Sequence, residues 1–125
     1  MPSTDADVVI VGAGPAGLFA AYRIIERSDL SVLIIDKGKE PKKRHCFEVK
    51  TGICNNCKFC DLMYGVGGSG LFSDGKLNLD PRIGGDLTEF TESYDDAMKI
   101  IDYVDSVFIK FGAPRKESFD PTKSY

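Results

Sequence analysis

The sequence predicts an α/β fold built around one parallel βαβ unit, and three observations lead to this prediction. A short apolar run, Val8–Val11, precedes a glycine-rich turn. A segment with apolar residues at helical spacing follows the turn, and a second apolar run at 31–36 ends on an acidic residue. Two parallel strands joined by one helix form a right-handed unit of this kind.

The composition is typical of one small soluble domain. The chain has 125 residues, of which 42% are hydrophobic, and this is enough apolar material for a real core. A net charge of −3, with lysines mixed among acidic residues, gives no basic face for nucleic acid. The apolar run near the N-terminus is far shorter than the roughly 20 residues that cross a bilayer. We therefore expect a cytoplasmic protein with neither a nucleic-acid nor a membrane partner.

The first strand and helix are expected at 8–11 and from Gly14 to about Arg27. The strand is β-branched and does not alternate with polar residues, which is typical of a parallel strand buried on both faces. In the helical segment, apolar residues recur three and four positions apart. Ser28 and Asp29 then end the helix before the second strand begins.

The turn between this strand and helix carries the pattern G-x-G-x-x-G. Gly12 allows a tight turn, Gly14 lets the backbone approach a pyrophosphate, and Gly17 lets the helix pack closely on the strand. Pro15 and Ala16 complete the motif, and the helix N-terminus adds free N–H groups. Asp36 ends the second strand, where a carboxylate accepts the ribose hydroxyls of a dinucleotide and repels a 2′-phosphate. The motif therefore predicts FAD or NAD rather than NADP.

Two segments resemble flavoproteins. DVVIVGAGPAGLFAAYRI, followed by VLIIDKG, resembles the N-terminal FAD-binding segment of glutathione-reductase-like flavoproteins. GVGGSGLFSDGKLNL, at 65–79, resembles the GGAGTFSDGKL stretch of FAD-dependent dehydrogenases. The resemblance covers roughly residues 7–90. It implies a Rossmann-like FAD/NAD(P)-binding fold and an oxidoreductase in which FAD mediates hydride or electron transfer with an unknown small-molecule substrate.

The second glycine segment lies within a cysteine- and glycine-rich loop expected at 41–80. Its glycines let the main chain run close to a flat ring or a pyrophosphate, and its serines supply small hydroxyl donors. The resemblance implies that this loop lies along the flavin. The candidate cofactor-binding residues outside the first motif are Asp36, Lys37, Arg44, Gly67, Gly68, Ser69, Gly70, Phe72 and Ser73.

The same segment also matches the first part of a phosphate-binding P-loop, G-x-x-x-x-G-K, at 70–76. The position after the lysine needs a Ser or Thr hydroxyl for magnesium, and Leu77 has none. The pattern therefore does not favour an NTPase. Asp74 and Lys76 either face the substrate or fix the loop by pairing with each other.

Four cysteines follow the second strand. Cys54, Cys57 and Cys60 form C-x-x-C-x-x-C, a spacing that lets thiolates converge on one centre, and Cys46 is a candidate fourth ligand. An iron–sulfur cluster or zinc is one interpretation, with His45 as a substitute ligand. A redox dithiol and a set of free thiols are the alternatives. Two functions are therefore alternatives to an FAD-dependent oxidoreductase. One is a metal or cluster module on a nucleotide-binding scaffold, and the other is an NAD-dependent dehydrogenase.

A last helix is expected at about 93–111. Ser93 and Asp96 resemble a capping box in which Asp replaces the usual Glu, and Gly112 and Pro114 end the helix. One stripe of this helix is predicted to be core: Tyr94, Ala97, Met98, Ile101, Val104, Phe108 and Phe111.

The chain is short for a complete doubly wound flavoprotein. The stretch after Phe111 is polar and turn-rich and supplies no further strands. We therefore expect residues 1–125 to be one FAD-binding N-terminal region of a larger fold, with the catalytic residues unassigned. A sheet with two strands leaves apolar surface open, so a homo-oligomer or a completing chain is the expected protein partner.

Overall fold

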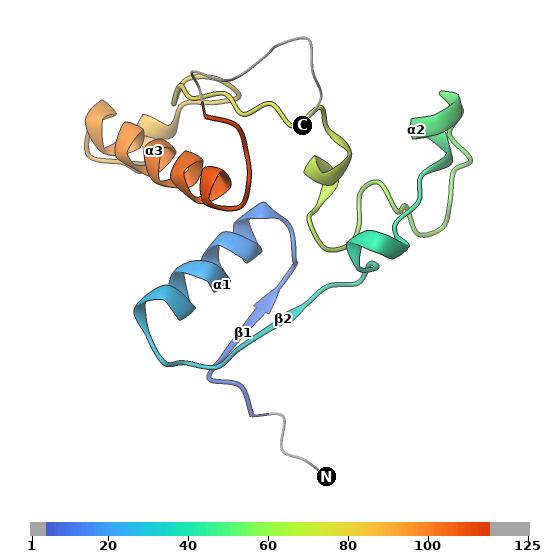
Figure 1. Ribbon diagram of the computed structural model, residues 1–125, viewed down its shortest axis with the longest axis horizontal. Coiled ribbons are helices and arrows are strands. Elements are labelled where there is room, and N and C mark those ends of the chain that lie inside the picture. Colours follow the sequence, from blue (N-terminus) through green and yellow to red (C-terminus); the bar gives the residue numbers. More distant parts are fainter. Residues whose placement is uncertain (1–4, 116–125) are drawn as a thin grey trace. The chain divides into compact units, whose positions relative to one another are not determined.

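The structure is a computed structural model that describes residues 5–115 (Figure 1). The chain divides into two compact units, Met1–Ser73 and Asp74–Tyr125. The single region expected over 1–125 stays a prediction. The polar stretch expected after Phe111 runs into residues 116–125, which lie outside the described residues.

The first unit contains the βαβ arrangement. Strand β1 (Val8–Val11) is followed by helix α1 (Pro15–Arg27) and strand β2 (Val32–Ile35). The strands pair in parallel, with Val8 opposite Val32 and Val11 opposite Ile35. The α/β class and the small two-stranded parallel sheet are therefore confirmed. Helix α1 contacts both strands, and Figure 1 shows it lying along them.

Within the described residues of the first unit, one face of this sheet is exposed, so the expectation of strands buried on both faces is wrong there. Both strands alternate between half-buried and exposed residues. Val11 is 86% exposed, and Val9, Leu33 and Ile35 are exposed beside it. In the described part of the first unit, α1 is the helix that contacts the strands, and it covers only one face. Within the described residues of the first unit, the strands thus have the sequence pattern of a sheet covered on both sides, but α1 packs on one face only.

The rest of the first unit is mainly loop, as expected, with short helical turns. Pro41–Lys43 and Ser69–Phe72 form 3-10 turns, and helix α2 spans Phe47–Thr51. Gly52 follows α2 in the left-handed conformation (φ +71°), which is the usual end of a helix. None of the helices among residues 5–115 is long and apolar enough to span a bilayer.

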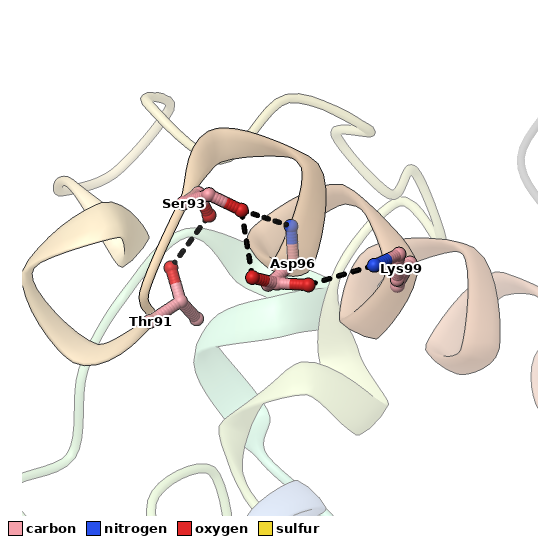
Figure 2. A network of polar contacts seen from close by, with 4 residues as sticks. All are labelled: Thr91, Ser93, Asp96 and Lys99. Atoms are coloured by element: carbon pink, nitrogen blue, oxygen red, sulfur yellow. Dashed lines mark hydrogen bonds and ion pairs between the residues drawn. The ribbon is translucent and has the colours of Figure 1, made fainter.

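The second unit is organised around helix α3 (Tyr94–Lys110), which a 3-10 turn at Leu87–Phe90 precedes. Ser93 caps α3 as predicted, since its Oγ accepts a hydrogen bond from the Asp96 amide at 3.1 Å (Figure 2). The Asp96 carboxylate does not complete an ordinary capping box. It accepts a bond from the Ser93 hydroxyl at 2.7 Å and pairs with Lys99 at 2.7 Å. Asp is one methylene shorter than the usual Glu, so it reaches the cap side chain instead of the cap amide.

Gly112 ends α3 as predicted. It has a φ of +105°, and its amide donates to the Ile109 carbonyl while the Ala113 amide donates to Phe108. This pair of bonds is the Schellman arrangement. The predicted core stripe is correct only in its middle. Ala97 and Ile101 are buried, and Val107, which lies outside the predicted stripe, is buried too. Three members of the predicted stripe are exposed: Tyr94, Phe108 and Phe111.

Candidate functional site

The first glycine turn joins β1 to α1 by a direct backbone approach. Gly12 has a φ of +107°, which favours glycine, and its amide donates to the Ile35 carbonyl at 2.7 Å. A Cβ on Gly17 would lie 1.9 Å from the Gly12 carbonyl oxygen. The helix therefore packs on the turn with no room for a side chain, which is the role expected for the last glycine of the motif.

Gly14 stands at the open end of α1. It is the residue that caps the helix, but no side chain caps the first amides. A Cβ on Gly14 would meet no protein atom within 4 Å. Pro15 follows as the first helical residue and lacks an N–H, so the amides of Ala16 and Gly17 are the first donors of the helix. The turn thus presents donors and empty space together, which suits an anionic group.

Asp36 lies at the carboxyl end of β2 and holds the turn. Its Oδ2 accepts from the Ala13 amide at 2.9 Å, and its Oδ1 accepts from the Gly38 amide at 2.7 Å. These hydrogen bonds hold the pKa of the Asp36 carboxyl below its ordinary value. The group is therefore a carboxylate at neutral pH. A carboxylate has about four acceptor sites, so Asp36 keeps capacity to accept a hydroxyl beside these backbone bonds.

The second glycine segment lies against the first. The Gly67 amide donates to the Ala13 carbonyl at 2.8 Å. A Cβ on Gly68, which has a φ of +62°, would lie 3.0 Å from Pro15 Cδ and 3.3 Å from Gly14 Cα. Segments that are more than fifty positions apart in the sequence thus meet at the open end of α1. Within this segment, Ser69–Phe72 forms a 3-10 turn.

Lys37 and Arg44, the two basic candidates, are both in contact with protein groups. The Lys37 ammonium lies 3.4 Å from the centroid of the Tyr64 ring. Arg44 is buried, at 3% exposure, and its guanidinium donates to main-chain carbonyls. Phe72 lies against it, with 5.1 Å between Arg44 Cζ and the ring centroid. Arg44 is therefore a buried part of the loop.

Asp74 and Lys76 pair with each other in the second unit. Lys76 Nζ lies 3.1 Å from Asp74 Oδ2, and the Lys76 amide donates to Asp74 Oδ1. The hydrogen bonds from Lys76 lower the pKa of the Asp74 carboxyl. Of the two alternatives for these residues, the structure has the pairing that fixes the loop.

All four cysteines line one hollow of ≈ 170 Å³ in the first unit. Cys54 and Cys57 are exposed, whereas Cys46 and Cys60 are half-buried, and all are free thiols. His45 and Asp61 also line the hollow. Within residues 5–115, however, no three cysteine, histidine or acidic side chains stand close enough to hold a metal ion. The thiols share a cavity without converging on one point.

Close packing between two glycines was not foreseen from the sequence. A Cβ on Gly38 would lie 2.3 Å from the Gly65 amide nitrogen, and a Cβ on Gly65 would lie 2.5 Å from the Lys39 carbonyl oxygen. Gly65 also has a φ of +116°. Two features of the sequence could have indicated this contact. Gly38 lies two positions after Asp36, and Gly65 is the first glycine of the second glycine segment.

The chain is similar to known proteins over its N-terminal third. The Thi4 family matches residues 2–41. An uncharacterized protein of Methanosarcina barkeri is 52% identical over 40 residues, which are 32% of this chain and 10% of that protein. The electron transfer flavoprotein-ubiquinone oxidoreductase of Arabidopsis thaliana is 54% identical over 43 residues, 30% of this chain and 7% of that protein. A probable enzyme of the same name from Acinetobacter baylyi is 60% identical over 40 residues, 27% and 7% of the two chains.

These matches are short. The aligned segments span only 7–10% of the length of these curated relatives. No solved structure matches the chain. The similarity lies in the segment that forms β1, α1 and β2, and it therefore concerns the first glycine turn and Asp36.

Proposed function

We propose that this chain binds FAD and forms part of an FAD-dependent oxidoreductase. The observation that carries the proposal is the meeting of two glycine segments at the open end of α1, through the bond from the Gly67 amide to the Ala13 carbonyl. The similarity of the N-terminal third to electron transfer flavoprotein-ubiquinone oxidoreductases supports the same proposal.

The residues of the site fit this cofactor. Gly14 leaves empty space where a Cβ would lie, and the first amides of α1 supply donors for a pyrophosphate. Asp36, an ionised carboxylate, is the acceptor for the adenosine ribose. The segment 67–73 would lie on the flavin side, and the lack of a side chain at Gly68 lets it lie close to Pro15 of the first turn. FAD, when bound, supplies the hydride or electron chemistry, and the protein positions it.

A titration of the whole chain with FAD, NAD and NADP tests the proposal. We expect saturable FAD binding and no measurable NADP binding, because the Asp36 carboxylate repels a 2′-phosphate. Flavin fluorescence and calorimetry give the affinities. NAD binding in preference to FAD would support an NAD-dependent dehydrogenase instead, and the absence of both would contradict a dinucleotide site.

A second candidate function is thiolate metal binding, and the hollow that all four cysteines share is the observation in its favour. Cys54 and Cys57 are exposed, so their loop would have to close over the hollow for the thiolates to converge. Four thiolates suit tetrahedral zinc or an iron–sulfur cluster.

We expect the protein, purified without air, to carry zinc or iron that a Cys54→Ser and Cys57→Ser double variant loses. Metal analysis with acid-labile sulfide distinguishes the two centres, since sulfide accompanies only the cluster. The FAD titration of the same variant is the control for correct folding. A metal-free protein whose thiols form a reversible disulfide would indicate a redox dithiol. Free thiols that neither bind metal nor form a disulfide would contradict both metal binding and a redox dithiol.

We propose that a second copy of this chain or a completing chain covers the exposed strand residues, of which Val11 is the most exposed. Exposed apolar surface of this kind is typical of association sites. We expect concentration-dependent self-association in sedimentation velocity experiments, and we expect Val11→Lys to abolish it by placing a charge on the exposed face. Leu30→Lys, at an exposed position outside the strands, is the matched control. A wild-type chain that is monomeric at all concentrations would leave a completing chain as the alternative partner.

A further inference from the structure

Arg44 is a buried charge that donates hydrogen bonds to main-chain carbonyls. Among the described residues, Arg44 is the one charged residue that is buried, with 3% of its surface exposed. A buried charge requires hydrogen bonds in place of those it made with water, because without them its desolvation strongly destabilises the folded state. The partners of Arg44 therefore show what this charge stabilises.

The guanidinium donates hydrogen bonds to several main-chain carbonyls of one segment. Nε donates to the Asp61 carbonyl at 2.9 Å, Nη2 to Leu62 at 2.9 Å, and Nη1 to Val66 at 2.7 Å. The Gly65 carbonyl lies 3.5 Å from Nη1. A planar guanidinium donates in several fixed directions at once, which a lysine ammonium does not reproduce. Arg44 thus fixes the backbone of the segment 61–66.

The segment 61–66 leads directly into the second glycine segment. The Val66 amide donates to the Lys39 carbonyl at 3.1 Å, and the next amide, that of Gly67, donates to Ala13 at 2.8 Å. Gly65 lies so close to Arg44 that a Cβ there would be 2.9 Å from Arg44 Cδ. The position of Gly67 against the first glycine turn therefore depends on the backbone that Arg44 holds.

We infer that Arg44 is a positioning residue that holds the second glycine segment against the dinucleotide turn, so that its loss weakens FAD binding without removing a cofactor contact. The inference rests on the proposed function, because the consequence concerns FAD. The sequence places Arg44 among the candidate cofactor-binding residues, whereas its donors point at carbonyls of 61–66.

Amide hydrogen exchange of the whole chain without FAD tests the positioning directly. In Arg44→Gln we expect the Val66 and Gly67 amides to exchange about tenfold faster or more, as for the loss of one charge-assisted hydrogen bond. The amides of β1 should keep their protection. Lys43→Gln is the matched control, since Lys43 is an exposed neighbour paired with Glu40. Unchanged exchange at Val66 and Gly67 would overturn the inference.

FAD affinity of the same variants tests the consequence. We expect Arg44→Gln to weaken binding about tenfold or more, Arg44→Lys to weaken it less, and Lys43→Gln to leave it unchanged. If β1 also loses protection in Arg44→Gln, that variant is partly unfolded. Amide exchange and FAD affinity are then compared in Arg44→Lys, which keeps the charge. If a variant exchanges faster at Gly67 but binds FAD with wild-type affinity, the inference is overturned and the proposed function is not affected. A wild-type chain that does not bind FAD would overturn the proposed function, while the exchange result still reports the positioning.

Discussion

Replacing Gly14 by valine is expected to abolish FAD binding while the protein stays folded. A Cβ at this position meets no protein atom within 4 Å, and the backbone angles of Gly14 (φ −74°, ψ −179°) are open to any residue. The valine side chain would instead fill the space at the end of α1 where a pyrophosphate has to approach the amides. The loss of binding should therefore come from exclusion of the cofactor and not from unfolding.

Calorimetric titration with FAD measures the loss, and far-UV circular dichroism with a urea melt measures the fold. Ala20→Val is the matched control, because it places the same valine side chain at an exposed position of α1 away from the turn. That control should bind FAD as the wild type does. Stoichiometric flavin in Gly14→Val would mean that the first glycine turn is not the pyrophosphate site.

Replacing Gly17 by alanine is expected to have the opposite effect, a large loss of stability. The new Cβ would lie 1.9 Å from the Gly12 carbonyl oxygen and 3.3 Å from Ile10 Cγ2. Backbone cannot move aside as a flexible side chain does, so α1 would have to shift away from β1. We expect a cost of about 3 kcal/mol or more, at the upper end of what overpacking causes.

Urea denaturation of the chain without FAD checks this second prediction through the midpoint of unfolding. Gly14→Ala is the control, since its methyl group enters open space and should change stability by no more than about 1 kcal/mol, through the cap and the backbone entropy alone. If Gly17→Ala unfolds at the wild-type urea concentration, then α1 does not depend on the close contact with Gly12. The two glycines thus separate the binding role of the turn from its packing role.

Much of the first unit was predictable from the sequence because its signals are local. The apolar runs, the helical spacing between them and the glycines of the turn each depend on neighbouring residues. They correctly predicted β1, α1 and β2 and the parallel pairing. The caps of α3 were predictable for the same reason, since Ser93 accepts from an amide and Gly112 donates to a carbonyl within three positions of itself.

Burial was predicted less well, because it depends on what other segments cover. The runs in β1 and β2 resemble strands covered on both faces, yet Val11 is 86% exposed. Phe108 and Phe111 continue the apolar stripe of α3 and are nevertheless exposed. Periodicity shows which residues share a face, but only the packing of distant elements determines whether that face is buried.

The sequence by itself determined the βαβ unit, the glycine turn and the acid at the end of β2, since each is written in adjacent residues. Only the tertiary structure decided how the second glycine segment meets the first, and that Arg44 serves this arrangement. It also decided that the four cysteines share one hollow without converging. The physical reason is that these contacts join residues far apart in the chain. Their geometry depends on how the loop after β2 folds back on the turn, through the carbonyls that Arg44 gathers and the bond from Gly67 to Ala13.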